Sequence, residues 1–341
     1  MSLSLDQALE MAEQALETGE FEDALAFADQ ALAKAPNDLD GLELKALALG
    51  ELGDWEQADG VFAKLLHQAP GHVTGLIAAA DVKIRQPGDD RERIEEGLEL
   101  LDQAEPKARQ DEALTIELEL LRGIAFNQLG EFEEALDAFA RVLHLDPEHG
   151  EAQLEQALGL FEQGRFADAK KAFERLSKDF PEEPWSFHYL GLLAERRGED
   201  PEPWFQKARA IDPEEFPPGV HMTSDEFDAA VEKAITALPE HARPHLENAL
   251  VNVEPIPSDE EIKEGLSPTI LGVFHGTPID ERLDTAATHH ETVRITLFQK
   301  NLERFARTKE ELEEEIRITV LHEVGHLLGL DEDELYERGL D

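Results

Sequence analysis

Apolar residues recur at helical spacing through most of the chain. In the segment from Ser224 to about Leu238, three apolar residues four positions apart share one face, namely Phe227, Val231 and Ile235. Ser224 can cap this helix. A last helix is predicted from Thr308 to Gly329, because Thr308 and Glu311 form a capping box ahead of a second apolar face. The positions of that face, again four apart, are Ile316, Val320, Val324 and Leu328.

Three short segments in the last third of the chain have the pattern of strands instead. Residues 251–253, 269–274 and 294–298 concentrate β-branched and aromatic side chains, and proline or glycine stands close to the ends of the first two. Strands interspersed with helices predict a small α+β domain at the C-terminal end of the chain.

The first two thirds of the chain repeat with a period of 34 residues. Four turns start with a glycine that is followed by a polar and then an aromatic residue, at Gly19, Gly53, Gly130 and Gly164. An alanine stands five residues after each glycine, and a proline stands seventeen residues after it. A glycine can end one helix in a left-handed turn, the alanine allows close helix approach, and the proline stops the second helix. Each period therefore predicts a pair of helices, and Gly198 begins a fifth, less regular one.

This pattern resembles the tetratricopeptide repeat. The resemblance implies an α-solenoid whose surface holds a protein or peptide, the alternative being an array that serves only as a spacer or dimerisation element. The spacing between Pro70 and Gly130 exceeds that of one intervening repeat by nine residues, which we place around residues 85–90. A turn-rich stretch near residue 215 then ends the pattern. We expect a repeat array over 1–214, a linker over 215–223 and a separate domain over 224–341.

The charge balance limits the classes of partner. The chain has 31 basic and 77 acidic residues and a net charge of -46. Such a surface repels phosphate groups and anionic lipids, so neither nucleic acid nor a membrane is an expected partner. The absence of cysteine excludes disulfides and thiolate metal sites. The N-terminus lacks the basic start and apolar run of a signal peptide, and a cytoplasmic protein is expected.

The last helix carries the clearest chemical motif of the sequence. His322 and His326 are four residues apart, so their imidazoles project from one helix face and can bind the same ion. Glu323 follows the first histidine, where it can reach a metal-bound water rather than the metal. Zinc lowers the pKa of such a water to about 7, and Glu323 can accept its proton as a general base. We therefore predict a zinc site of the metallopeptidase type.

The third zinc ligand is expected shortly after Gly329, which can turn the chain back toward the ion. Counted from His322, the third ligand position of the extended pattern His-Glu-x-x-His-x-x-Gly-x-x-His/Asp falls on Glu332. Asp331 and Asp333 are the alternatives. Residues that are conceivable as oxyanion stabilisers are Tyr336, His275, His289 and His290, although a structural role is favoured for each.

Residues 224–341 resemble a family of small zincin-like metallopeptidases of bacteria. The stretches that carry the resemblance are 270–278 (Ile-Leu-Gly-Val-Phe-His-Gly-Thr-Pro), 294–298 (Arg-Ile-Thr-Leu-Phe) and 319–326 (Thr-Val-Leu-His-Glu-Val-Gly-His). The resemblance implies a minimal α+β zincin fold in which the strand at 294–298 runs along the metal cleft and accepts an extended peptide. The whole chain is therefore expected to be mostly α, a tetratricopeptide-type α-solenoid followed by a zincin-like domain.

Two functions are compatible with a metal site, and a repeat-only adaptor without metal is the third option. The first is a zinc metallopeptidase whose repeat array recruits a protein substrate or a regulator. The second is a non-catalytic interaction scaffold whose C-terminal domain has a structural zinc site. Glu323 favours the enzyme, because a structural zinc site needs no general base beside its ligand.

Overall fold

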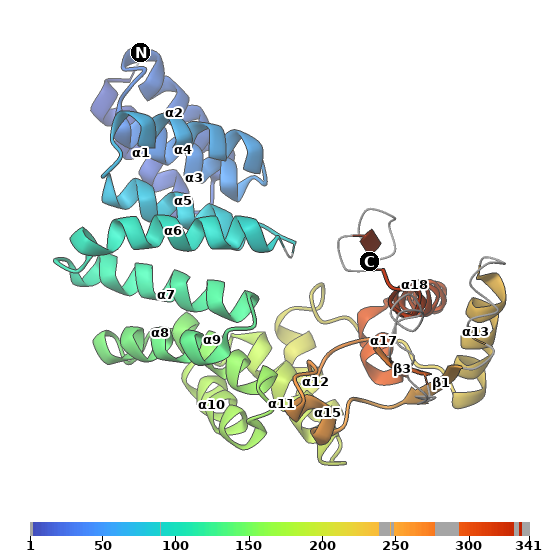
Figure 1. The fold of residues 1–341 in the computed structure, drawn as a ribbon. Coiled ribbons are helices and arrows are strands. Elements are labelled where there is room, and N and C mark those ends of the chain that lie inside the picture. Colours follow the sequence, from blue (N-terminus) through green and yellow to red (C-terminus); the bar gives the residue numbers. More distant parts are fainter. Residues whose placement is uncertain are drawn as a thin grey trace, which may run out of the picture. The chain divides into compact units, whose positions relative to one another are not determined.

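Paired helices form the first part of the chain (Figure 1). The computed structural model describes residues 3–88, 90–238, 246, 249–276, 293–330 and 334–335. The helices of the repeats are α1 (Leu5–Glu17), α2 (Phe21–Lys34), α3 (Leu39–Glu51), α4 (Trp55–Gln68), α5 (Val73–Arg85), α6 (Arg91–Ala108), α7 (Glu112–Gln128), α8 (Phe132–Leu145), α9 (Gly150–Glu162), α10 (Phe166–Asp179), α11 (Pro184–Arg196) and α12 (Glu202–Ile211). The predicted α-solenoid is confirmed.

The glycines of the repeat turns adopt the left-handed conformation that their spacing predicts. The φ angles are 75° at Gly19, 79° at Gly53, 74° at Gly130, 69° at Gly164 and 68° at Gly198. The alanine five residues after each of the first four glycines is fully buried. The left-handed glycine ends the first helix of each repeat, and the buried alanine lets the second helix pack closely against it.

The irregular repeat differs from its prediction. Five residues separate α5 from α6, whereas three separate α1 from α2, so the turn near residues 85–90 holds only part of the insertion. The remainder lengthens two helices, α6 to 18 residues against 14 in α4, and α7 to 17 against 13 in α3. Four extra residues add about one helical turn, so each helix keeps the same face toward its neighbours.

The chain divides into two compact units, Met1–Gly159 and Leu160–Asp341. The second unit contains α10 to α12 and the C-terminal α+β elements, namely α13 (Ser224–Ala237), β1 (Ala249–Glu254), α15 (Asp259–Lys263), β2 (Gly272–His275), β3 (Val293–Phe298), α17 (Gln299–Phe305) and α18 (Lys309–Leu327). None of the described helices is both long enough and apolar enough to cross a lipid bilayer.

Among the described residues, three strands form one sheet in the order β1-β3-β2. β3 pairs in parallel with β1 and antiparallel with β2. Ile295 and Leu297 of β3 are fully buried and belong to one hydrophobic core with residues of α13 and α18. The predicted small α+β domain is thus confirmed, with its core between the sheet and these two helices.

The predicted starts of the strands and of α13 differ from the structure by one to three residues. β2 begins at Gly272 rather than near residue 269, because a turn precedes it in which Ile270 N donates to Ser267 O at 3.3 Å. The cap of α13 is Thr223 rather than Ser224. Thr223 N donates to the Glu226 carboxylate at 2.8 Å, and Glu226 N donates back to Thr223 Oγ1 at 3.3 Å.

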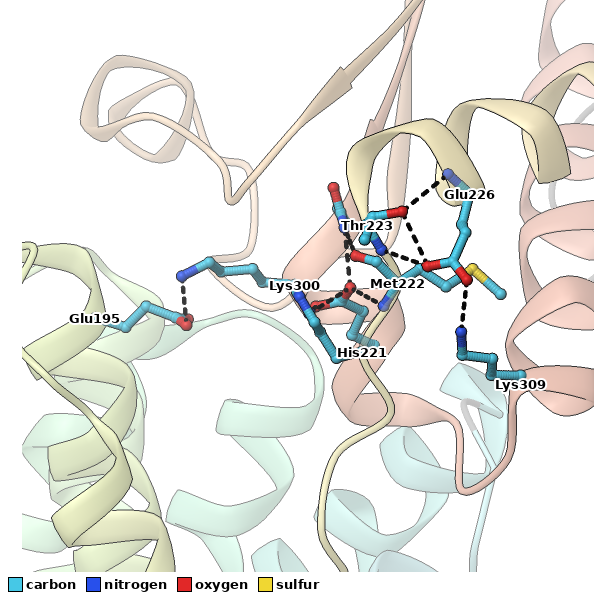
Figure 2. A network of polar contacts seen from close by, with 9 residues as sticks. Glu195, His221, Met222, Thr223, Glu226, Lys300 and Lys309 are labelled. Atoms are coloured by element: carbon cyan, nitrogen blue, oxygen red, sulfur yellow. Dashed lines mark hydrogen bonds and ion pairs between the residues drawn. The ribbon is translucent and has the colours of Figure 1, made fainter.

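The segment predicted as a linker, 215–223, is hydrogen bonded to α17 within the second unit. Val220 N donates to the carbonyl of Glu303 at 3.1 Å, and Met222 N donates to the Glu303 carboxylate at 2.9 Å. Figure 2 shows the contacts around Met222 and their continuation from Thr223 through Glu226 to Lys309 at the start of α18. The start of α13 and the start of α18 are therefore tied to each other.

Four carboxylates lie on the first helices of successive repeats: Glu43, Asp81 and Glu155 are partly buried, and Glu117 is more exposed. Burial raises the pKa of each above its usual value. The charges on Asp81 and Glu43 raise the pKa of Glu117 further. Arg85 offsets part of this charge, with Nε 2.6 Å from Asp81 Oδ1 and Nη1 2.9 Å from Glu151 Oε1.

These groups predict that mild acid stabilises the first unit. An acid with a raised pKa in the folded state lowers stability at neutral pH, and this penalty disappears as the pH falls through that pKa toward the ordinary value of 4.5. Glu117→Gln should therefore raise the melting temperature by about 1–3 °C at pH 7 and by less at pH 5. Thermal unfolding followed by circular dichroism measures both. Glu134→Gln, on the exposed surface of α8, is the control, and an equal gain from it would contradict the prediction.

Candidate metal centre

Helix α18 carries both histidines of the motif. Its cap is Thr308, whose Oγ1 accepts from Glu311 N at 3.1 Å, as predicted. The capping box closes differently from its usual form, since the Glu311 carboxylate accepts from Arg307 N at 2.8 Å. The predicted core face is confirmed, since Ile316, Val320 and Val324 are buried in the core and Leu328 packs against it.

The structure brings the two histidine rings together. His322 Nε2 and His326 Nε2 lie 3.1 Å apart, and the ring planes are nearly perpendicular at 83°. Two imidazole nitrogens bound to one tetrahedral zinc are separated by about 3.3 Å. The donor set and its spacing therefore fit two of the protein ligands of a zinc ion.

The end of α18 orients His326. Gly329 has a φ of 90°, and in the resulting turn Leu330 N donates to Gly325 O at 3.0 Å and Gly329 N donates to His326 O at 3.1 Å. This turn brings the carbonyl of Leu330 to 3.2 Å from His326 Nδ1. Because a carbonyl only accepts, Nδ1 carries the proton, and in the neutral ring the lone pair is at Nε2, where a metal would bind.

Glu323 lies where α18 crosses the start of β2. Its side chain is only 5% exposed. A Cβ atom added to Gly272 would lie 3.0 Å from Glu323 Oε1 and 2.6 Å from Thr319 Cγ2. Glycine at this position therefore allows the carboxylate to lie directly beside the strand. Sequence reasoning missed this contact, because nothing local marks Gly272 as the partner of α18.

The resemblance places an extended peptide on the strand at 294–298, and the sheet does not allow this. β3 is paired along Arg294–Leu297 on both sides, by β1 and by β2, so its backbone groups are already used. Among the described residues, β2 is the strand beside α18 that pairs on one side only. In the part of the chain that the structure describes, the open strand edge beside α18 is therefore that of β2.

Several predicted site residues fall outside the described ranges, namely Glu332, Asp331, Asp333, Tyr336, His289 and His290. Within the described residues, no three His, Asp or Glu side chains are grouped closely enough to hold a metal ion. His275 is described and is not brought to the histidine pair. It is three residues beyond Gly272 and so points to the opposite face of the sheet, where its Nε2 lies 3.7 Å from Glu261 Oε1 of α15.

Comparison with known proteins agrees with this organisation. Residues 246–340 match a family model described as zincin-like metallopeptidase, and residues 9–73 and 127–196 match models described as tetratricopeptide repeat. PilW, described as a widely conserved type IV pilus biogenesis factor, is 18% identical and superposes with a TM-score of 0.54 over 62% of this chain and 94% of its own. PilF of Pseudomonas aeruginosa is also 18% identical, with a TM-score of 0.51 over 62% of this chain and 92% of its own.

These two structural neighbours bear on the fold alone, because their sequence identity is low. The family models assign the two parts of the sequence separately. The chain is therefore a tetratricopeptide-repeat protein. Its C-terminal part, over residues 246–340, contains a zincin-like metallopeptidase domain.

The crossing at Gly272 predicts a specific pair of substitutions. Gly272→Ala should cost about 1–3 kcal/mol, since the new methyl group must displace the buried Thr319 side chain or β2. Thr319→Ser removes the methyl group in question, so the double variant should recover part of the loss. Urea unfolding gives the free energy of unfolding of Gly272→Ala, of Thr319→Ser and of the double variant. Gly219→Ala is the matched control, because its added Cβ would meet nothing closer than 3.6 Å. Equal stability of Gly272→Ala and Gly219→Ala would contradict the proposed crowding.

Proposed function

We propose that the chain is a zinc-dependent peptidase in which His322 and His326 hold the metal and Glu323 is the general base. The observation that supports this most directly is the 3.1 Å separation of the two Nε2 atoms on a helix whose intervening carboxylate is buried beside an edge strand. Glu332 is proposed as the third ligand, with Asp331 and Asp333 as alternatives.

The chemistry of the bound metal is that of a Lewis acid. Zinc would polarise the scissile carbonyl and make a water molecule acidic enough to react near neutral pH. His326 is held for this task by its Nδ1 contact with the Leu330 carbonyl, which keeps Nε2 as the binding atom. Glu323 accepts the proton of the attacking water and later donates it to the leaving amine.

Strand β2 is proposed to align the substrate. An extended peptide that pairs with the edge of β2 would be fixed by backbone hydrogen bonds, independent of its sequence. The carboxylate of Glu323 lies against Gly272, the first residue of this strand. Peptide bonds aligned along β2 would therefore pass close to the general base.

The repeat array is proposed to recruit the protein substrate or a regulator. Arrays of this kind bind extended partners along the surface of their stacked repeats. The first helices of the array carry the carboxylates of Glu43, Asp81, Glu117 and Glu155, none of them fully buried, and the whole chain is strongly acidic. A partner with a basic segment would complement this charge.

The metal is tested by elemental analysis of the purified protein. The native chain should hold about one zinc ion, and His322→Ala and His326→Ala should each lose most of it while keeping their helical circular dichroism. Glu323→Gln should keep its zinc, because the proposed base does not bind the metal. A native chain without zinc would contradict both the peptidase and the structural zinc site.

The chemistry is tested by cleavage of a peptide library. The native protein should cleave members of the library, and Glu323→Gln should lower kcat by at least about 100-fold, the usual contribution of a general base. The glutamine is isosteric and is compared at equal zinc content. Equal traces of cleavage in both proteins would show that the domain does not cleave peptides and would favour the interaction scaffold.

A further inference from the structure

The last repeat contributes a buried carboxylate to the C-terminal domain. Glu195 lies in the last turn of α11, and its side chain is only 10% exposed. Its two oxygens contact two cations of α17, at 2.8 Å from Lys300 Nζ and 2.5 Å from Arg304 Nη1. Figure 2 shows the contact between Glu195 and Lys300. All of these residues belong to the second compact unit.

Arg304 links Glu195, through Asn301, to the segment that precedes β2. Its Nη2 donates to Asn301 Oδ1 on the same helix. Asn301 is 4% exposed, and its Nδ2 donates to the carbonyls of Pro268, at 3.2 Å, and Ile270, at 2.7 Å. Because a side-chain amide has one fixed orientation when both ends are bound, Arg304 decides which end of Asn301 faces these carbonyls.

The carbonyls held by Asn301 immediately precede the edge strand. Phe298 N also donates to Leu271 O at 2.8 Å, so the approach to β2 is fixed to the β3–α17 junction. The next residue is Gly272, which meets Thr319 and Glu323 of α18. A continuous series of contacts therefore leads from Glu195 to the proposed general base.

The segment that connects β1 to β2 is also bonded to the repeats at two further points. Arg196 Nη2 lies 2.7 Å from Asp259 Oδ1 and donates to the Pro257 carbonyl at 3.0 Å. Ser267 Oγ donates to the carboxylate of Glu162, at the end of α9, at 2.7 Å. The chain between β1 and β2 is thus attached at both of its ends to helices of the repeat array.

We propose that Glu195 is a positioning residue for β2, and that α11 is a structural part of the zincin-like module. Removal of one partner from a buried ionic network leaves the remaining charges uncompensated, so the loss at Glu195 should reach its neighbours. The consequence for catalysis rests on the proposed peptidase function. The positioning of β2 itself does not.

Hydrogen exchange in the metal-free full-length protein tests the positioning. Glu195→Gln should speed amide exchange in peptides covering residues 266–276 by about tenfold, as expected for loss of a hydrogen bond to a charged group. Helices α1 to α8 should be unchanged. Glu199→Gln is the matched control, since it removes the same charge nearby and Glu199 pairs with Arg197 at the surface. Unchanged exchange at 266–276, or equal acceleration throughout the chain, would overturn the proposal.

A second variant separates the ion pair from the rest of the series. Arg304→Lys keeps a cation beside Glu195 but lacks the planar fork that contacts Glu195 and Asn301 together. It should therefore accelerate exchange at 266–276 as Glu195→Gln does, and the double variant should add little. Additive effects of the two substitutions would show that they act separately, against the proposal.

Kinetics give a readout that a general loss of stability would not produce. If β2 aligns the substrate, Glu195→Gln should raise KM by about fivefold with little change in kcat. A fall in kcat at unchanged KM would overturn the role in substrate alignment. A native chain without cleavage would reject the peptidase function and leave the exchange result, measured without metal, to decide the positioning.

Discussion

The close crossing of helix α18 over strand β2 is the constraint on which the C-terminal domain depends. Gly272 supplies the space at this crossing, and Glu323 fills it with a carboxylate that is almost fully buried. Burial of a carboxylate costs free energy that an apolar side chain in the same place would not cost. The residue type at position 323 therefore points to chemistry rather than to packing, and the histidines on either side of it supply the reason.

Helix ends in this chain are set by neighbouring residues, which is why the sequence predicts them well. The turn glycines of the repeats and the cap at Thr308 are local signals, and the structure confirms them. The misplaced cap of α13 has the same origin. Thr223 and Ser224 are both good capping residues, and only the reciprocal bonds between Thr223 and Glu226 decide between them.

Strand order and the surroundings of the site depend on residues far apart in the sequence, so spacing alone could not predict them. The pattern at 294–298 predicts a strand but carries no information that β3 is paired on both sides. The spacing of His322 and His326 likewise predicts a shared ion. It does not predict the carbonyl of Leu330 at His326, which depends on the fold of the turn after Gly329. Sequence therefore predicts the ligand pair, and the fold supplies what orients it.

Basic residues are few in this chain, and three of them cluster where α11 contacts the C-terminal elements. Only 31 basic residues stand against 77 acidic ones, yet Arg196, Lys300 and Arg304 all lie where α11 meets the C-terminal elements. Salt screens repulsion between exposed carboxylates far more than it weakens partly buried ion pairs. A change in ionic strength should therefore alter the repulsion between the exposed carboxylates, while the ion pairs of Arg196, Lys300 and Arg304 persist. Glu195 and Arg196 of the last repeat already form ion pairs within the same chain. A partner that binds the array would therefore have to use other residues of this repeat.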